Sequence, residues 1–178
     1  MKTQVSPGGF TLIEMVLVIG IVACLCALLM PTITALQQRA NSTACASNLR
    51  QIGISAQLYA ADHDQNLPTI EPWPSQPVFP SDSGVETLLN ALKAYGVTET
   101  VLQCRTDIAG PQYYTKEGSS YEWCPMANGQ NVQSVKSVWE GNMPGLTLSR
   151  LILAFDYTNV HHEYSNVLFG DGHVAAAN

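Results

Sequence analysis

The chain has 178 residues, which is enough for one modest domain beyond its apolar N-terminal segment. Eight Lys and Arg residues stand against 14 Asp and Glu residues, so the formal net charge is −6. This surplus of negative charge argues against nucleic acid as a main partner, because phosphate binding needs clustered cations.

An apolar run near the N-terminus dominates the sequence. No charged residue occurs between positions 15 and 30. Counted from Phe10 the run has about 20 residues, and a helix of that length spans the roughly 30 Å hydrocarbon core of a bilayer. The sequence therefore predicts a transmembrane helix over 10–30, with Glu14 just inside its N-terminal edge.

The junction before this run differs from a secretory signal peptide. A signal peptide carries its cleavage site after the apolar core, whereas the small residues Gly8-Gly9 precede it here. The segment Gly9-Phe10-Thr11-Leu12-Ile13-Glu14 resembles the prepilin signature of type IV pilins and type II secretion pseudopilins. A plain membrane anchor is the alternative, and it explains neither the Gly-Gly-Phe junction nor the acid.

The resemblance implies that residues 1–9 are a leader peptide. A prepilin peptidase would cut on the cytoplasmic side between Gly9 and Phe10, and Phe10 would then be N-methylated. Pro31 falls where the family often has a helix-kinking proline, and proline by itself removes a helical hydrogen bond.

Glu14 is the residue to which the resemblance assigns assembly. A carboxylate inside a membrane segment is unfavourable unless it finds a partner or reaches the interface. The amine that cleavage would create at Phe10 is such a partner, and an intersubunit pair would fix the register of adjacent helices. The alternative is that Glu14 only snorkels to the membrane surface.

Residues 31–61 are expected to continue the helix and to pack on a head formed by residues 62–178. Their apolar residues recur at spacings of three and four, which indicates one stripe on an amphipathic helix. The stripe consists of Cys45, Leu49, Ile52, Ala56 and Tyr59. The helix is expected to end near Ala61, before a segment of turn composition.

The head is expected to hold a helix over 83–95 and an antiparallel sheet. Ser83 and Glu86 have the spacing of a capping box, and Gly96 suits the position after the helix. Strands are expected over 112–115, 119–124, 151–155, 166–169 and 173–174. A long helix followed by an antiparallel sheet is an α+β fold, and the resemblance implies that it is pilin-like.

Five cysteines are an odd number for disulfide pairing. Cys24 and Cys26 lie in the membrane run and are interpreted as small apolar residues. Cys104 and Cys124 are the candidate disulfide, because a bridge across their short loop would stabilise the head by about 3 kcal/mol. Two buried thiols are the alternative, and Cys45 is the next candidate partner. Zinc is less favoured, because no Cys-x-x-Cys spacing is present.

The C-terminal region gathers carboxylates and imidazoles. The spacing from His161 to Asp171-Gly172 resembles the His-x9-Asp-Gly signature of one branch of pseudopilin-like proteins. Asp156, His161 and Asp171 are candidate cation ligands if the strands pair, and Ca²⁺ is held by some secretion pseudopilins. An exposed turn is the preferred interpretation, and no cofactor is expected.

These patterns predict a structural subunit of a type II secretion pseudopilus or a type IV pilus-like filament, and not an enzyme. The expected partners are copies of the chain through the N-terminal helix, other pilins or pseudopilins, the prepilin peptidase and the inner-membrane assembly platform. The expected location is the inner membrane, single-pass, with a cytoplasmic N-terminus and a periplasmic head. The alternatives are an anchored binding module or minor tip pilin with a C-terminal ligand or cation site, and an anchored metal hydrolase.

Overall fold

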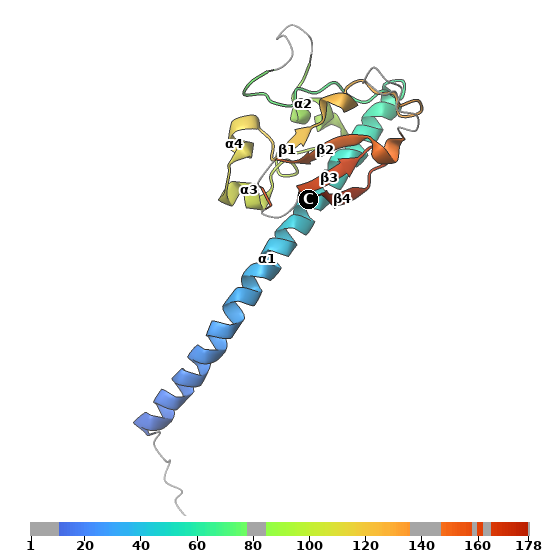
Figure 1. The fold of residues 1–178 in the computed structure, drawn as a ribbon. Coiled ribbons are helices and arrows are strands. Elements are labelled where there is room, and N and C mark those ends of the chain that lie inside the picture. Colours follow the sequence, from blue (N-terminus) through green and yellow to red (C-terminus); the bar gives the residue numbers. More distant parts are fainter. Residues whose placement is uncertain (1–10, 78–84, 136–146, 158–159, 162–164, 178) are drawn as a thin grey trace, which may run out of the picture. The chain divides into compact units, whose positions relative to one another are not determined.

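The structure is a computed structural model that describes residues 11–77, 85–135, 147–157, 160–161 and 165–177 (Figure 1). Its contacts divide the chain into two compact units, 1–37 and 38–178, which are described separately below. Helix α1 (Leu12–Asp62, 51 residues) belongs to both units.

In the first unit, α1 is apolar and exposed. An 18-residue window reaches a mean hydropathy of 2.9 with none of its residues buried, so α1 is long and apolar enough to cross a membrane. Exposure is high along its whole length, from 82% at Leu12 to 50% at Ile33. The helix continues through position 31. The side chain of Pro31 lies outside the described residues, so the kink stays a prediction.

In the second unit, α1 provides the centre of the hydrophobic core. The predicted stripe is confirmed, because Cys45, Leu49, Ile52 and Ala56 are buried and Tyr59 packs against them. At Gly53 a Cβ atom would lie 2.9 Å from Leu168 Cδ1, so glycine is what allows α1 to approach the sheet this closely. The helix ends at Asp62, one residue beyond the expected end.

The head contains one antiparallel sheet of four strands, β1 (Tyr121–Trp123), β2 (Ile152–Asp156), β3 (Ser165–Phe169) and β4 (Val174–Ala177). They are hydrogen-bonded in the order β1-β2-β3-β4, and each pair is antiparallel. The strands beginning near 151 and 166 are confirmed to within a residue. Together with α1 the sheet makes the fold α+β (Figure 1).

The strand predicted over 112–115 is wrong, because this segment begins helix α4 (Tyr113–Glu117), which follows helix α3 (Arg105–Ala109). The reason is that a side chain outside α4 caps its first turn. The buried carboxylate of Asp107 accepts the backbone N–H groups of Tyr113 and Tyr114 at 2.7 and 2.8 Å. Two N–H groups that would otherwise lack partners at the helix start are thereby satisfied.

The helix predicted from Ser83 is shorter in its described part. Helix α2 (Leu88–Leu92) begins at Thr87, whose hydroxyl accepts the N–H of Asn90, and the turn η1 (Lys93–Tyr95) extends it. Glu86 instead pairs with Ile70 in an isolated β-bridge, and Ser83 lies outside the described residues. Two further turns, η2 (Pro125–Ala127) and η3 (Leu148–Arg150), flank the first two strands. Gly96 takes the left-handed conformation after the helix, with φ of 98°.

Candidate functional site

At the start of α1, Thr11 and Glu14 form a reciprocal capping box. Glu14 Oε2 accepts the backbone N–H of Thr11 at 2.8 Å and the Thr11 hydroxyl at 2.7 Å. The N–H of Glu14 in turn donates to Thr11 Oγ1 at 3.4 Å. The Thr-x-x-Glu spacing carries this signal in the sequence, and the prediction missed it.

This cap gives Glu14 a hydrogen-bond partner in its own chain. Both bonds from Thr11 end on Oε2. Among the described residues no hydrogen bond reaches Oε1, which can therefore accept a group from another chain. Gly9 and Phe10 lie outside the described residues, so cleavage between them and methylation of Phe10 stay predictions.

The head contains one disulfide among its described residues, and it differs from the predicted one. Cys104 bonds to Cys45 across a sequence separation of 59 residues, with the two Cα atoms 5.5 Å apart, and Cys124 is a buried free thiol. Cys45 lies on the buried stripe of α1, and Cys104 lies just before α3. Both residues are buried in the same hydrophobic core, where the two sulfurs meet. The prediction that Cys104 pairs with Cys124 is therefore wrong.

The three candidate cation ligands do not form one site. Asp156 Oδ2 lies 3.3 Å from His161 Nε2, and both side chains are buried. Asp171 instead contacts the exposed His173, with 2.5 Å between Asp171 Oδ1 and His173 Nδ1. Asp156 is opposite the start of β3 and Asp171 follows its end, so the strand itself separates them.

Hydrogen bonds fix the buried carboxylate of Asp156 on one side. Its Oδ2 accepts the backbone N–H of Asn166 at 2.9 Å and the Asn166 Nδ2 group at 2.7 Å. The same Nδ2 group lies 3.3 Å from Ser42 Oγ on α1. Oδ1 of Asp156 is buried and has no hydrogen-bond partner in the described part of the chain.

The sulfurs of the disulfide lie beside the imidazole of His161, which in turn contacts the Asp156 carboxylate. Cys104 Sγ is 3.7 Å from His161 Nε2, and the ligand atoms of Cys45, Cys104 and His161 all lie within 4.8 Å of one another. We call Cys45, Cys104, Asp156 and His161 the buried cluster. Its members come from α1, the residue before α3, the end of β2 and the segment between β2 and β3, so no sequence spacing reveals the cluster.

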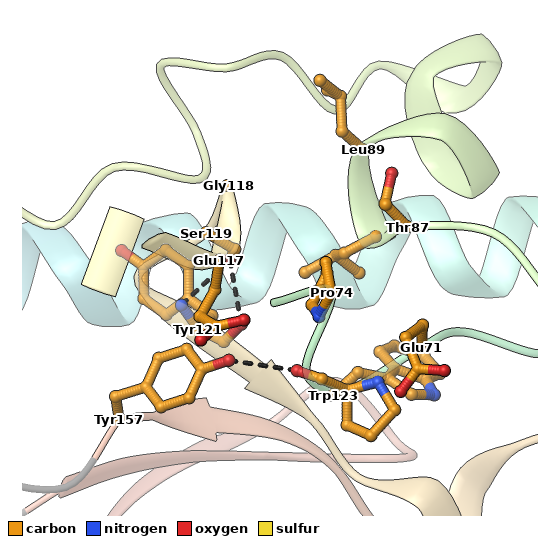
Figure 2. Close-up of a pocket in the computed structure, with 12 residues that line it drawn as sticks. Glu71, Pro74, Thr87, Leu89, Glu117, Gly118, Ser119, Tyr121, Trp123 and Tyr157 are labelled. Carbon is orange, nitrogen blue, oxygen red and sulfur yellow. Dashed lines mark hydrogen bonds between the residues drawn. The ribbon is translucent and has the colours of Figure 1, made fainter. Parts of the chain in front are cut away.

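The surface cavity shown in Figure 2 has a volume of about 100 Å³ and lies between the 71–74 segment, α2 and β1. Small-molecule sites usually enclose roughly 300–1,000 Å³, so this cavity suits a few water molecules better than a substrate. The Tyr157 hydroxyl donates to the carbonyl of Pro72 at 3.0 Å, and Glu117 accepts the N–H and hydroxyl of Ser75. Burial raises the pKa of Tyr157, which keeps the phenol a donor. These contacts hold a loop in place.

The comparisons with known proteins find no match. No family model matches the chain, and neither a curated protein nor a solved structure resembles it at a significant level. The function must therefore be argued from the residues and their geometry.

Proposed function

We propose that this chain is a pilin-like or pseudopilin subunit that builds a filament through α1. The observation that carries the proposal is the division of α1 into two halves. The half within 12–37 exposes apolar side chains all around, whereas the half after Gln38 supplies one buried stripe to the core of the head. In a soluble domain the exposed apolar half of α1 would be unfavourable in water, whereas a membrane-anchored subunit needs both halves of the helix.

Energetics support a non-aqueous environment for the first half. Fully burying one Leu, Ile or Val side chain is worth about 1.5–3 kcal/mol. The exposed residues of this type include Leu17, Ile19, Ile21, Leu25 and Leu28. Lipid removes this surface from water before assembly, and the equivalent helices of neighbouring subunits would do so in a filament.

The proposal gives roles to the N-terminal residues. Removal of the leader 1–9 leaves an amine on Phe10, four residues before Glu14 in the chain. The carboxylate of Glu14 then neutralises the amine of a neighbouring subunit and sets its axial position. In this proposal the chain crosses the inner membrane once, with a cytoplasmic N-terminus and a periplasmic head, and its partners are prepilin peptidase, the assembly platform and other pilins or pseudopilins. An α+β head on a long N-terminal helix is consistent with such a subunit.

Glu14→Gln tests this role cleanly, because Gln also serves in a capping box and only the charge is lost. Intact-mass measurement should still show loss of residues 1–9 and one added methyl group. Oxidative cross-linking in membranes through the exposed Cys24 and Cys26 should fall sharply in this variant. Thr11→Val is the matched control, because it weakens the cap without changing the charge.

The outcome decides between three interpretations of Glu14. Loss of cross-linking in Glu14→Gln alone supports the assembly role. Loss in Thr11→Val but not in Glu14→Gln assigns the carboxylate to helix capping. Unchanged cross-linking in both would leave Glu14 as a snorkelling residue and would contradict the proposal.

A second candidate function is an anchored, exported binding module. The observation that favours it is the buried pair of Asp156 and His161, which has no place in an argument about filament assembly. A binding module would remain monomeric in membranes whatever residue stands at position 14, whereas a filament subunit would not.

A further inference from the structure

The buried cluster brings together the donor types that a zinc ion binds. Two sulfurs come from positions 59 residues apart, and one imidazole nitrogen and one carboxylate come from a third segment of the chain. Zinc takes such thiolate, imidazole and carboxylate ligands in tetrahedral sites. Calcium prefers oxygen ligands alone, so sulfur in the cluster argues against it.

Two of the distances between donors, both from the His161 imidazole, agree with a tetrahedral site. Ligand bonds of about 2.3 Å for sulfur and about 2.0–2.2 Å for nitrogen and oxygen give edges of about 3.6 Å between sulfur and nitrogen and about 3.4 Å between nitrogen and oxygen. The structure has 3.7 Å from Cys104 Sγ to His161 Nε2 and 3.3 Å from His161 Nε2 to Asp156 Oδ2. The two sulfurs, which are bonded to each other, would have to separate. The Asp156 carboxylate, which is not among the three donors that lie within 4.8 Å of one another, would have to move toward them.

Asp156 supplies an independent indication of a missing ligand. Its Oδ1 atom is buried without a hydrogen-bond partner among the described residues, although a buried polar atom of this kind usually has one. A metal ion that contacts both oxygens of this carboxylate would satisfy it. Asn166, which donates twice to Oδ2, would orient the carboxylate as a hydrogen-bonded neighbour of a metal ligand.

We propose that the reduced head binds one Zn²⁺ through Cys45, Cys104, His161 and Asp156, and that the disulfide is the metal-free state of the same site. This goes beyond the proposed assembly function and does not depend on it. The newly made chain carries thiols, so zinc binding would hold α1, the start of α3 and the sheet together before oxidation. Formation of the disulfide then releases the ion and joins α1 to α3 covalently.

The exchange balances with a disulfide compound as the oxidant. Zinc binding to two Cys thiols releases two protons. In the oxidation, the two zinc-bound thiolates give two electrons to the disulfide compound, which takes up two protons and leaves as two thiols. The Cys45–Cys104 bond forms and one Zn²⁺ is released.

The test uses the full chain in detergent, reduced with a phosphine, freed of the reagent, loaded with Zn²⁺ and dialysed without oxygen. Elemental analysis should find one zinc per reduced chain and none per oxidised chain. Adding oxidised glutathione should release the zinc as the disulfide forms. Co²⁺ in place of Zn²⁺ should give thiolate-to-metal charge-transfer bands and the intense visible bands of a tetrahedral site.

The variants separate the four ligands from the rest of the head. Cys45→Ser should abolish zinc retention, and His161→Gln should weaken binding by about tenfold or more, as even loss of an outer partner does. Cys124→Ser and Asp171→Asn are the matched controls and should retain zinc. Circular dichroism shows whether each reduced chain is folded.

Two results would overturn the proposal. The first is a reduced chain that retains no zinc. This result counts if the reduced chain stays folded, and also if it unfolds and added Zn²⁺ does not restore its fold. The second is equal zinc retention by the parent chain and Cys45→Ser.

Discussion

The Cys45–Cys104 bond makes a quantitative prediction that the alternative pairing does not. A bridge across a sequence separation of 59 residues removes chain entropy worth about 4 kcal/mol from the unfolded state. We therefore expect Cys104→Ala to lower the free energy of unfolding of the head by about 4 kcal/mol. Cys124→Ala removes one small buried thiol and should lower it by about 1 kcal/mol.

Guanidinium unfolding of the two variants in detergent, followed by tryptophan fluorescence, measures this difference. Trp123 is buried in β1 and reports the loss of the core. A loss of about 4 kcal/mol shifts the midpoint by on the order of 1 M. Equal losses in the two variants, or a non-reducing peptide map that links Cys104 to Cys124, would refute the reasoning.

Alkylation of the parent chain provides a control. Burial raises the pKa of the Cys124 thiol, so its reactive thiolate is scarcer at pH 7 and the folded head should react slowly. After unfolding without reduction, Cys124 should react readily, whereas Cys45 and Cys104 should stay unmodified.

Three further substitutions test the packing of the head, each by denaturant unfolding of the full chain. The buried carboxylate of Asp107 accepts three hydrogen bonds, one of them from the Ser120 hydroxyl at 2.6 Å. Asp107→Asn places an amide N–H against one of these donors and should lower the free energy of unfolding by about 3 kcal/mol. An unchanged unfolding midpoint would contradict this. Gly53→Ala should also destabilise the head, because the new Cβ would lie 2.9 Å from the buried Leu168 side chain. Overpacking costs about 1–3 kcal/mol, whereas Ala gains roughly 1 kcal/mol in helix propensity. A stabilised variant would show that Leu168 moves freely. Burial raises the pKa of Glu122 above 4.5, so the stability it contributes is present below that pH and is lost as pH rises through the raised value. Glu122→Gln should therefore flatten this part of the pH profile and be more stable than the parent at pH 7.

The parts of the fold that rest on periodicity could be predicted from the sequence. The stripe from Cys45 to Tyr59 is buried where the spacing placed it, because an amphipathic helix has only one way to cover its apolar face. The strands β2 and β3 follow from their apolar runs. The antiparallel pairing of β3 with β4 follows from the short turn after Phe169, since consecutive strands joined by a tight turn pair antiparallel.

The elements that failed depend on contacts that the apolar pattern does not mark. Residues 113–117 form a helix because Asp107 caps it, and the local sequence reads equally well as a strand. Two Ser or Thr candidates compete to start the helix near 88, and Thr87 caps α2 in the structure. The buried cluster and the disulfide pairing were out of reach for the same reason, since spacing says nothing about which cysteines meet across the fold.

The position of Cys45 has a mechanical consequence. It is the first buried residue of the α1 stripe to be joined to the rest of the head, and one turn later Asn48 donates to the carbonyl of Gln103 at 3.1 Å. A pull on the exposed half of α1 therefore meets the contact between Ser42 and Asn166 first. It then meets a covalent bond and a hydrogen bond to the adjacent residues Cys104 and Gln103. Cys104 passes the load on through its N–H to Ser120, and from there to Asp107. With the disulfide intact, α1 cannot be peeled from the head by tension, and the apolar contacts behind it are loaded last.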